Sequence, residues 1–183
     1  MKPVKIDEWL GLSIFHISCL HIIRQSNIHL NHRVWGERMG TPVTTAKEVA
    51  LFIIHGYNNT VDNLRLQKIL YFFWMDYYKK CKKELFGDRI EAWAYGPVIP
   101  NVYYRYRSFI ASPIKDSNPY VLSEEVCRDL NELLDKYRGY STNDLIRKSH
   151  VEGGPWYKCY KEDRQFVEIP KYSIIEYLEN QAE

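Results

Sequence analysis

Apolar residues between positions 62 and 78 predict a buried helix in the middle of the chain. In this stretch, DNLRLQKILYFFWMDYY, apolar side chains recur at helical spacing and also extend around the rest of the helix. The positions at helical spacing are Leu66, Ile69, Leu70, Phe73 and Tyr77. A helix that is hydrophobic nearly all round is buried. We therefore expect a central helix that begins at a cap, Asp62 or Asn63, and runs to about Leu85, before Gly87.

Helix-start signals elsewhere predict further helices around it. Thr45-Ala46-Lys47-Glu48 has the form of a capping box, which predicts a helix running to about Tyr57. The other predicted starts are Pro100, Ser123, Ser141 or Thr142, Pro155 and Pro170. Apolar residues follow Pro100, Ser123, Ser141 or Thr142, and Pro170, whereas Pro155-Trp156 opens one further turn of helix. Gly139 closes the helix that Ser123 begins.

Alternating residues predict two short strands. Residues 89–95, RIEAWAY, alternate between two faces, and Gly96-Pro97 then turns the chain. Residues 166–169 predict a second strand that pairs with the first. The expected fold is therefore mainly α, a compact single helical domain around the central apolar helix with a small two-stranded antiparallel β element.

Composition and charge narrow the possible function classes. The chain has 183 residues, 45% of them hydrophobic, which suits one domain that is stable without a disulfide or a metal. The net charge of +2 is too small to indicate a nucleic-acid binder, and no basic recognition helix stands out. We therefore expect no direct binding to nucleic acid.

Cysteine and histidine spacing predicts neither a metal site nor a cofactor. The four cysteines, Cys19, Cys81, Cys127 and Cys159, show no ligand spacing. His29 and His32 could share a helix face, which is weak support for a metal.

The apolar segment 9–23 is too short to span a bilayer, and Asp7 and Glu8 do not suit a signal peptide. We expect a cytoplasmic protein without a membrane partner.

Residues 1–38 differ from the rest of the chain. Gly36-Glu37-Arg38 can be encoded by a sequence that resembles a bacterial ribosome-binding site, directly before Met39, and aromatic residues become dense after that point. We expect an N-terminal extension at 1–38, untranslated or disordered, and a domain at 39–183. The N-terminal mass of the native protein tests whether translation starts at Met39.

The chain lacks the common catalytic motifs, so a binding module is expected rather than an enzyme. A dyad of Cys159 and His150 is the remaining catalytic option, without an evident third group.

Lys68 lies among leucines and aromatics, and either pairs with Glu91 or extends to solvent. The run of Trp, Tyr and Pro over residues 93–106 suits either a protein interface or a core.

Three segments stand out in order along the chain: LRLQKILYF (64–72), IEAWAYGPVIPNVYYRY (90–106) and GGPWYKC (153–159). Together they resemble the Panacea domain, the family of SocA-like antitoxins and phage-associated proteins, and the match extends from about Thr45 to Leu178. The resemblance implies the antitoxin of a type II toxin–antitoxin system, which binds and neutralises a toxin encoded in the same operon. The alternatives are an adaptor that delivers the toxin to a ClpXP-type protease, or an uncharacterised hydrolase.

The resemblance also implies which residues matter, without assigning any catalytic role. The motif positions, structural or toxin-binding, are Leu66, Gln67, Lys68, Tyr71, Glu91, Trp93, Gly96, Pro97, Pro100, Pro155 and Trp156. The candidate toxin interface consists of Tyr95, Val98, Tyr103, Tyr104 and Tyr106.

Overall fold

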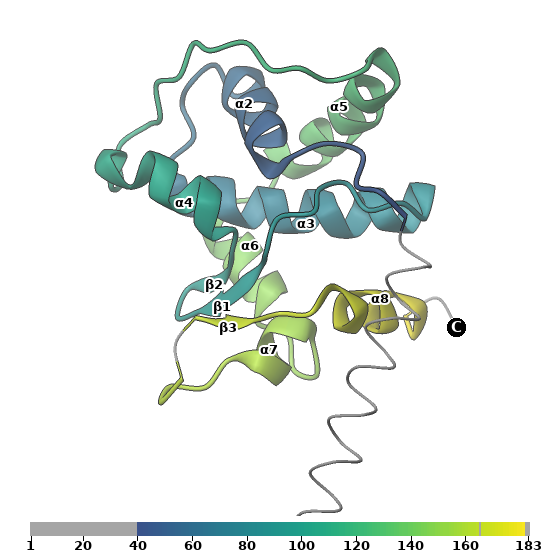
Figure 1. Ribbon diagram of the computed structural model, residues 1–183. Helices are drawn as coiled ribbons and strands as arrows, with labels where there is room; N and C mark the ends of the chain where they lie inside the picture. Colours follow the sequence, from purple (N-terminus) through teal and green to yellow (C-terminus); the bar gives the residue numbers. More distant parts are fainter. Residues whose placement is uncertain (1–39, 165, 182–183) are drawn as a thin grey trace, which may run out of the picture. The chain divides into compact units, whose positions relative to one another are not determined.

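The computed structural model describes residues 40–164 and 166–181, which form mainly helices and a small antiparallel sheet (Figure 1). The helices are α2 (Ala46–Gly56), α3 (Asn63–Cys81), α4 (Pro100–Tyr106), α5 (Glu124–Arg138), α6 (Thr142–Ser149), α7 (Pro155–Cys159) and α8 (Lys171–Glu179), with a 3-10 turn η1 (Arg107–Phe109) after α4. The strands are β1 (Glu91–Trp93), β2 (Gly96–Val98) and β3 (Val167–Glu168). The predicted mainly α fold is confirmed. The expectations for residues 1–38, including the start at Met39 and the pair His29 and His32, lie outside the described residues.

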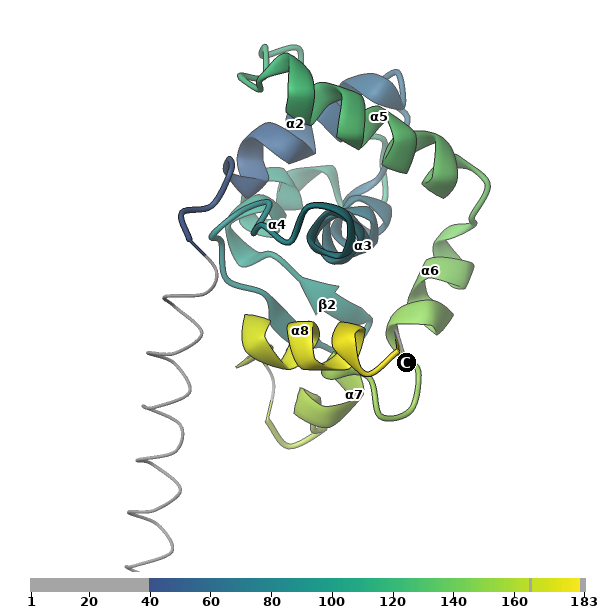
Figure 2. The ribbon, with the colours of Figure 1, turned by 90° about the vertical axis from the view of Figure 1, so that its right-hand side faces the viewer.

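Helix α3 contacts α2, α4, α5, α6, α8 and β2. Figure 2 looks along it and shows α2 and α5 on one side, with α6 and α8 on others. Most of its side chains are buried, including the polar Asn63, Gln67 and Lys68. Asp62 is its cap, because the Asp62 carboxylate accepts a hydrogen bond of 2.9 Å from the Arg65 amide. None of the described helices combines the length and the hydrophobicity of a membrane-spanning segment.

Helix α3 ends at Cys81, four residues before the predicted end near Leu85. Lys82 adopts a left-handed conformation, with φ of 54°. The carbonyls of Glu84 and Leu85 then accept hydrogen bonds of 2.9 Å from the amides of residues 43 and 44. This pairing with a distant segment replaces the continued helix, which is why local signals did not reveal the end.

The predicted helix caps are confirmed, with one change. Ser123 and Ser141 cap α5 and α6, and Ser141 forms a full capping box with Asp144. Thr45 caps α2 by accepting from the Glu48 amide, but the return bond of a capping box is not formed. The Glu48 carboxylate instead accepts a hydrogen bond of 2.6 Å from the Val121 amide.

The sheet has three strands in the order β2-β1-β3, one more than predicted. Strand β3 pairs antiparallel with β1, as expected, with Glu91 opposite Glu168. The additional strand is β2, which pairs Gly96 with Trp93 and Val98 with Glu91. The Gly96-Pro97 pair was predicted as the turn, yet it belongs to the strand, and the turn lies at residues 94–95. Tyr95 is therefore at the tip of a β1–β2 hairpin.

Candidate protein-binding groove

Polar side chains of α3 join it to the β1–β2 hairpin and the residue after it. The Gln67 amide group donates to Asn63 Oδ1 at 3.0 Å, and its oxygen accepts from the Ile99 amide at 2.9 Å. The neighbouring Lys68 Nζ donates to the carbonyl oxygen of Pro97 at 2.7 Å. We call Gln67, Lys68, Pro97 and Ile99 the hairpin latch. Because all of these groups are removed from water, each hydrogen bond prevents the cost of an unsatisfied buried group.

Lys68 is completely buried, and both sequence-based alternatives for it are wrong. Its exposed fraction is 0%, so it does not extend to solvent. Glu91 does not pair with it either: the Glu91 carboxylate lies 3.2 Å from Arg89 Nε and accepts a hydrogen bond of 2.9 Å from Trp93 Nε1. Burial lowers the pKa of Lys68 from 10.5 to about 7, because an ammonium group loses its hydration in the interior.

Gly96 makes the close approach of Lys68 possible. Its φ of +106° is a conformation that L side chains rarely adopt. A Cβ atom at this position would lie 2.9 Å from Lys68 Nζ and 2.8 Å from Ser149 Oγ. The fold therefore requires glycine at this motif position, because a side chain there would clash with Lys68 and Ser149.

The motif Pro155-Trp156 attaches α7 to β1. Trp156 is buried, and its Nε1 donates a hydrogen bond of 2.9 Å to the backbone carbonyl of Trp93. Pro155 is also buried, at the start of α7, and Pro100 occupies the same position in α4. Leu66 and Tyr71 belong to the buried set of α3. Contacts within the fold therefore account for most of the motif positions, without any contact to a toxin.

Exposed apolar and aromatic side chains gather around a cavity of about 510 Å³ beside the hairpin. We call this cavity the aromatic groove. It is lined by Asp62, Asn63, Leu64, Gln67, Trp93, Ala94, Tyr95, Val98, Tyr103, Arg107, Ile110, Ala111 and Phe166. These residues come from the start of α3, the hairpin, α4, η1 and the segments next to η1 and β3. Its boundary therefore combines segments that are distant in the sequence.

Trp93 is the central aromatic contact of the groove. Its ring lies edge-to-face against Tyr103, with centroids 4.7 Å apart, and against Phe166 at 4.9 Å. Tyr104 extends this cluster, because its ring packs 5.5 Å from Tyr103 and 6.2 Å from Trp93. Rings packed on one another present a rigid surface, so ordering them on binding costs little entropy.

The structure brings four of the five predicted interface residues to this region. Tyr95 and Tyr104 are 71% and 53% exposed, and Tyr103 is half-buried in the groove wall. Val98 is buried, but it lines the groove. The prediction for Tyr106 is wrong: it is 2% exposed, and its hydroxyl donates to Asp116 at 2.9 Å, so it holds α4 to the following loop.

Sequence reasoning missed three exposed residues of the groove. Leu64, Ile110 and Phe166 are 38%, 81% and 49% exposed. Ile110 lies beyond the end of α4 at Tyr106 and adopts a left-handed conformation, with φ of 52°. Phe166 is also left-handed, with φ of 66°. A large apolar residue in that conformation has no sequence signal, since turns of this kind favour Gly or Asn.

The geometry does not assemble a cysteine–histidine dyad. Cys159 and His150 share no hydrogen bond in the described part of the chain, and His150 Nδ1 lies 2.6 Å from the backbone carbonyl of Ile146. Burial raises the pKa of the Cys159 thiol, with Lys158 opposing this weakly, so the reactive thiolate is disfavoured. The arrangement is that of a packed cysteine rather than of an activated nucleophile.

Comparison with known proteins places the chain in a family. Residues 66–157 match the family described as "Antitoxin SocA-like, Panacea domain", a range that contains the hairpin latch and Trp156. The chain belongs to this family. It is also similar to Antitoxin SocA of Caulobacter vibrioides (strain NA1000 / CB15N), with 29% identity over 109 residues. That match covers 52% of this chain and 58% of the relative. No solved structure matches the chain.

Proposed function

We propose that this protein is the antitoxin of a type II toxin–antitoxin pair and that it neutralises its toxin by direct protein–protein binding. The observation that carries the proposal is membership of the antitoxin SocA-like family over residues 66–157. The toxin would be encoded by a neighbouring gene of the same operon, as the family resemblance implies.

The aromatic groove is the surface that we propose contacts the toxin. Monomeric proteins rarely expose clustered apolar side chains without a partner. Here Tyr95, Tyr104, Ile110 and Phe166 are all at least 49% exposed, around one groove. Tyrosine is enriched among residues that dominate interface energies. The occupant would be an apolar segment of the toxin that inserts between the hairpin and η1.

Charged residues that line the groove would favour one orientation of the bound toxin segment. Arg107 lines the groove, and its guanidinium lies 5.8 Å from the ring centroid of Tyr104, within cation–π range. Asp62 lines the groove as well and caps α3 through the Arg65 amide. A toxin segment with an acidic residue near Arg107 would gain electrostatic complementarity, which favours the correct orientation more than raw affinity.

Growth rescue tests the proposal. Each gene that flanks the native locus is expressed alone in a host, and then together with the full chain. One toxic neighbour whose effect is abolished by the full chain, with the two proteins co-purifying, supports neutralisation by binding. If neither neighbour is toxic, or if rescue occurs without a complex, the proposal fails.

The toxin's fate in the same experiment distinguishes sequestration from delivery to a protease. Sequestration predicts toxin that is inhibited but intact in cells with or without a ClpXP-type protease. Toxin that disappears only when that protease is present would indicate an adaptor instead. Full rescue by the Cys159→Ala and His150→Ala variants is expected, because neither residue lines the groove. Loss of rescue by both variants, with the folded state retained, would support the hydrolase alternative.

A further inference from the structure

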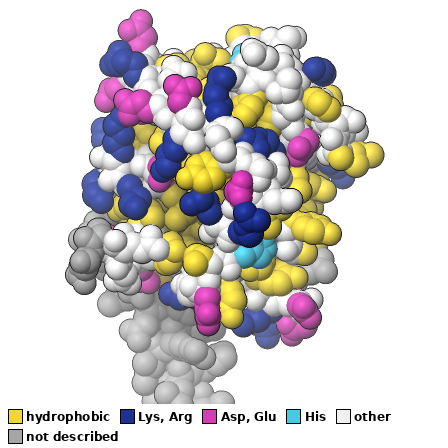
Figure 3. Space-filling model, turned by 180° about the vertical axis from the view of Figure 1, so that it is seen from behind, with side chains coloured by type: hydrophobic (Ala, Val, Ile, Leu, Met, Phe, Trp, Pro, Cys, Tyr) yellow, Lys and Arg dark blue, Asp and Glu magenta, His cyan; other side chains and the backbone are white. Residues whose placement is uncertain are grey.

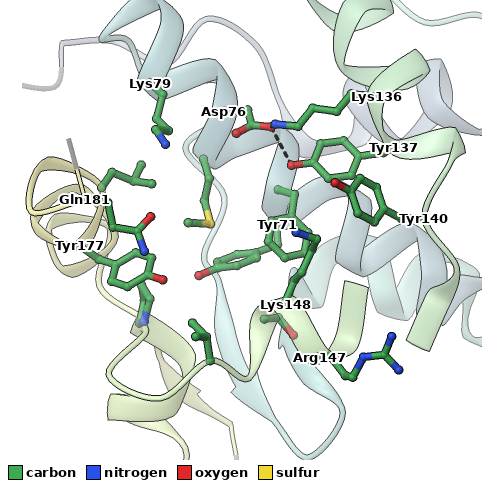
Figure 4. A pocket seen from close by; sticks show the side chains of 16 residues that line it. Tyr71, Asp76, Lys79, Lys136, Tyr137, Tyr140, Arg147, Lys148, Tyr177 and Gln181 are labelled. Atoms are coloured by element: carbon green, nitrogen blue, oxygen red, sulfur yellow. Dashed lines mark hydrogen bonds and ion pairs between the residues drawn. The ribbon is translucent and has the colours of Figure 1, made fainter. Parts of the chain in front are cut away.

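A second cavity, of about 490 Å³, lies among α3, α5, α6 and α8, and its lining is basic (Figure 4). We call it the basic cavity. It shares no lining residue with the aromatic groove. Its basic residues are Lys79, Lys136, Arg147 and Lys148, and its acidic residue is Asp76. On the face of the molecule seen in Figure 3, Lys and Arg side chains lie among exposed hydrophobic ones.

Two of these cations have no carboxylate of the described residues within ion-pair distance, although Asp144 interacts electrostatically with Lys148 at longer range. Lys136 is neutralised by Asp76, with 2.5 Å between Nζ and the carboxylate, and Arg147 is paired with Asp144. Lys79 and Lys148 form no ion pair with any carboxylate of the described residues. Lys79 points toward the cavity in Figure 4, and Lys148 Nζ lies 4.9 Å from the ring centroid of Tyr140 at its wall.

Tyr71 supplies an independent sign of a ligand. Its side chain is 1% exposed, yet Figure 4 shows its hydroxyl directed into the cavity. The hydroxyl makes no hydrogen bond to another residue in the described part of the chain. Burial, and to a smaller extent Tyr177, raises the pKa of Tyr71, so the phenol stays protonated and can donate. The hydroxyl of Tyr177 is directed toward the same space. Every fully buried side-chain nitrogen or oxygen of the described residues has a hydrogen-bond partner, so the unpartnered Tyr71 oxygen must reach the open space of the cavity, where a ligand can accept its hydrogen bond.

Aromatic rings form another part of the wall of the basic cavity. Phe72 and Tyr137 line the cavity and stack on each other, with ring centroids 5.6 Å apart. Tyr140 lines it too, beside Tyr137 at 5.8 Å. The volume lies within the range of about 300–1,000 Å³ that is typical of small-molecule sites. Ammonium groups and phenol donors suit phosphate oxygens, and flat rings suit a nucleobase.

We propose that the basic cavity binds a small phosphate-bearing ligand of nucleotide size. Lys79, Lys148 and the Tyr71 hydroxyl contact its phosphate oxygens, and its base lies against the aromatic wall. This inference goes beyond the antitoxin function and requires no toxin for its test.

Calorimetric titration of the full chain tests the proposal, with ATP, GTP, adenosine and tripolyphosphate as probes. We expect one-to-one binding of a nucleotide that is at least tenfold tighter than binding of adenosine or of tripolyphosphate. Tyr71→Phe should weaken it at least fivefold, and the double variant Lys79→Gln, Lys148→Gln at least tenfold. Lys47→Gln is the matched control, because Lys47 belongs to α2 and does not line the cavity.

Unfolding midpoints without ligand separate a lost contact from a lost fold. Tyr71→Phe removes only an unpartnered hydroxyl, so the midpoint of this variant should equal that of the wild type. The proposal is overturned if no nucleotide binds at millimolar concentration, or if tripolyphosphate binds as tightly as ATP. It is also overturned if Tyr71→Phe and the double lysine variant bind as well as Lys47→Gln.

Discussion

Lys68 Nζ donates a hydrogen bond of 2.7 Å to the carbonyl oxygen of Pro97, and this contact fixes the position of the hairpin on α3. The hairpin carries Tyr95 at its tip and Trp93 in the wall of the aromatic groove. The geometry of an exposed surface thus depends on a buried amine. Two predictions about stability follow from Lys68 and its neighbour Gly96.

Replacing Gly96 should disturb the contact between α3 and the hairpin. Gly96→Ala would place a Cβ within 3 Å of Lys68 Nζ and Ser149 Oγ, in a backbone conformation with φ of +106°. We expect the free energy of unfolding to fall by roughly 2 kcal/mol or more, since strain of this kind costs about 1–3 kcal/mol before any clash is added. Urea unfolding measures the change.

Gly139→Ala is the control for this substitution. Gly139 has φ of −73°, and a Cβ there would meet no atom within 4 Å. Its unfolding free energy should stay within about 1 kcal/mol of the wild-type value. Equal effects of the two substitutions would contradict a special role for Gly96.

Lys68 should give the unfolding free energy a dependence on pH above neutrality. The pKa of Lys68 is about 7 in the folded protein, against 10.5 for a solvated lysine. Between these values the unfolded chain binds a proton that the folded chain does not, so the unfolding free energy rises with pH. Lys68→Met removes this contribution. The wild type should therefore gain stability relative to Lys68→Met as pH rises from about 7 to about 10.

Urea unfolding of both proteins across this range checks the prediction. The groups that titrate in both proteins cancel in the difference between them, so the comparison isolates Lys68. A difference that stays constant with pH would show that Lys68 keeps its ordinary pKa in the folded state.

Gln67 should contribute to folding through its two hydrogen bonds. Gln67→Leu keeps the volume but leaves the buried Ile99 amide without its acceptor at 2.9 Å. We expect a loss of about 2 kcal/mol in unfolding free energy, the cost of an unsatisfied buried group. Asn101→Ala is the comparison, because Asn101 forms an exposed hydrogen bond to Asp88 and should cost about 0.5 kcal/mol or less. Thermal unfolding that ranks the two variants in the opposite order would argue against the latch.

Tyr104 should matter for binding rather than for folding. Tyr104→Ala truncates a side chain that is 53% exposed, so the unfolding midpoint should change little. Binding to the cognate toxin should weaken by about 2 kcal/mol if the ring is an interface anchor. Tyr95→Ala should likewise change the unfolding midpoint little and weaken toxin binding by about 2 kcal/mol. Isothermal titration with the purified toxin gives the affinity.

Val121→Ala controls for general loss of apolar surface. Val121 is 80% exposed and does not line the groove. This variant should bind the toxin like the wild type. Unchanged binding by Tyr95→Ala and Tyr104→Ala would place the toxin on another surface, and an equal loss of folding stability would place the tyrosines in the core.

Local signals account for the parts of the fold that the sequence predicted. Asp62, Ser123 and Ser141 cap their helices because a side-chain oxygen meets an amide only two or three residues ahead. The residues whose environment was not predicted depend on distant partners. The end of α3 depends on pairing of residues 84 and 85 with residues 43 and 44, and Lys68 depends on a carbonyl at Pro97.

The candidate groove was predicted only where aromatic residues cluster in sequence. Tyr95, Tyr103 and Tyr104 lie in one tyrosine-rich run, and the structure brings them to the groove and its edge. Leu64 and Phe166 come from segments far from that run, so only the tertiary fold brings them to the groove. Tyr106 belongs to the run but points inward, since helix α4 gives it a different face from that of Tyr104.

The hairpin latch also limits what family membership can reveal about the partner. Its side chains point into the protein, so a match to the motif identifies a scaffold and carries little information about the toxin. Specificity would then be encoded at positions that the motif leaves free, among them Leu64, Tyr104, Ile110 and Phe166. Exchanging these side chains between relatives, with the latch intact, is the direct route to antitoxins redirected to a different toxin.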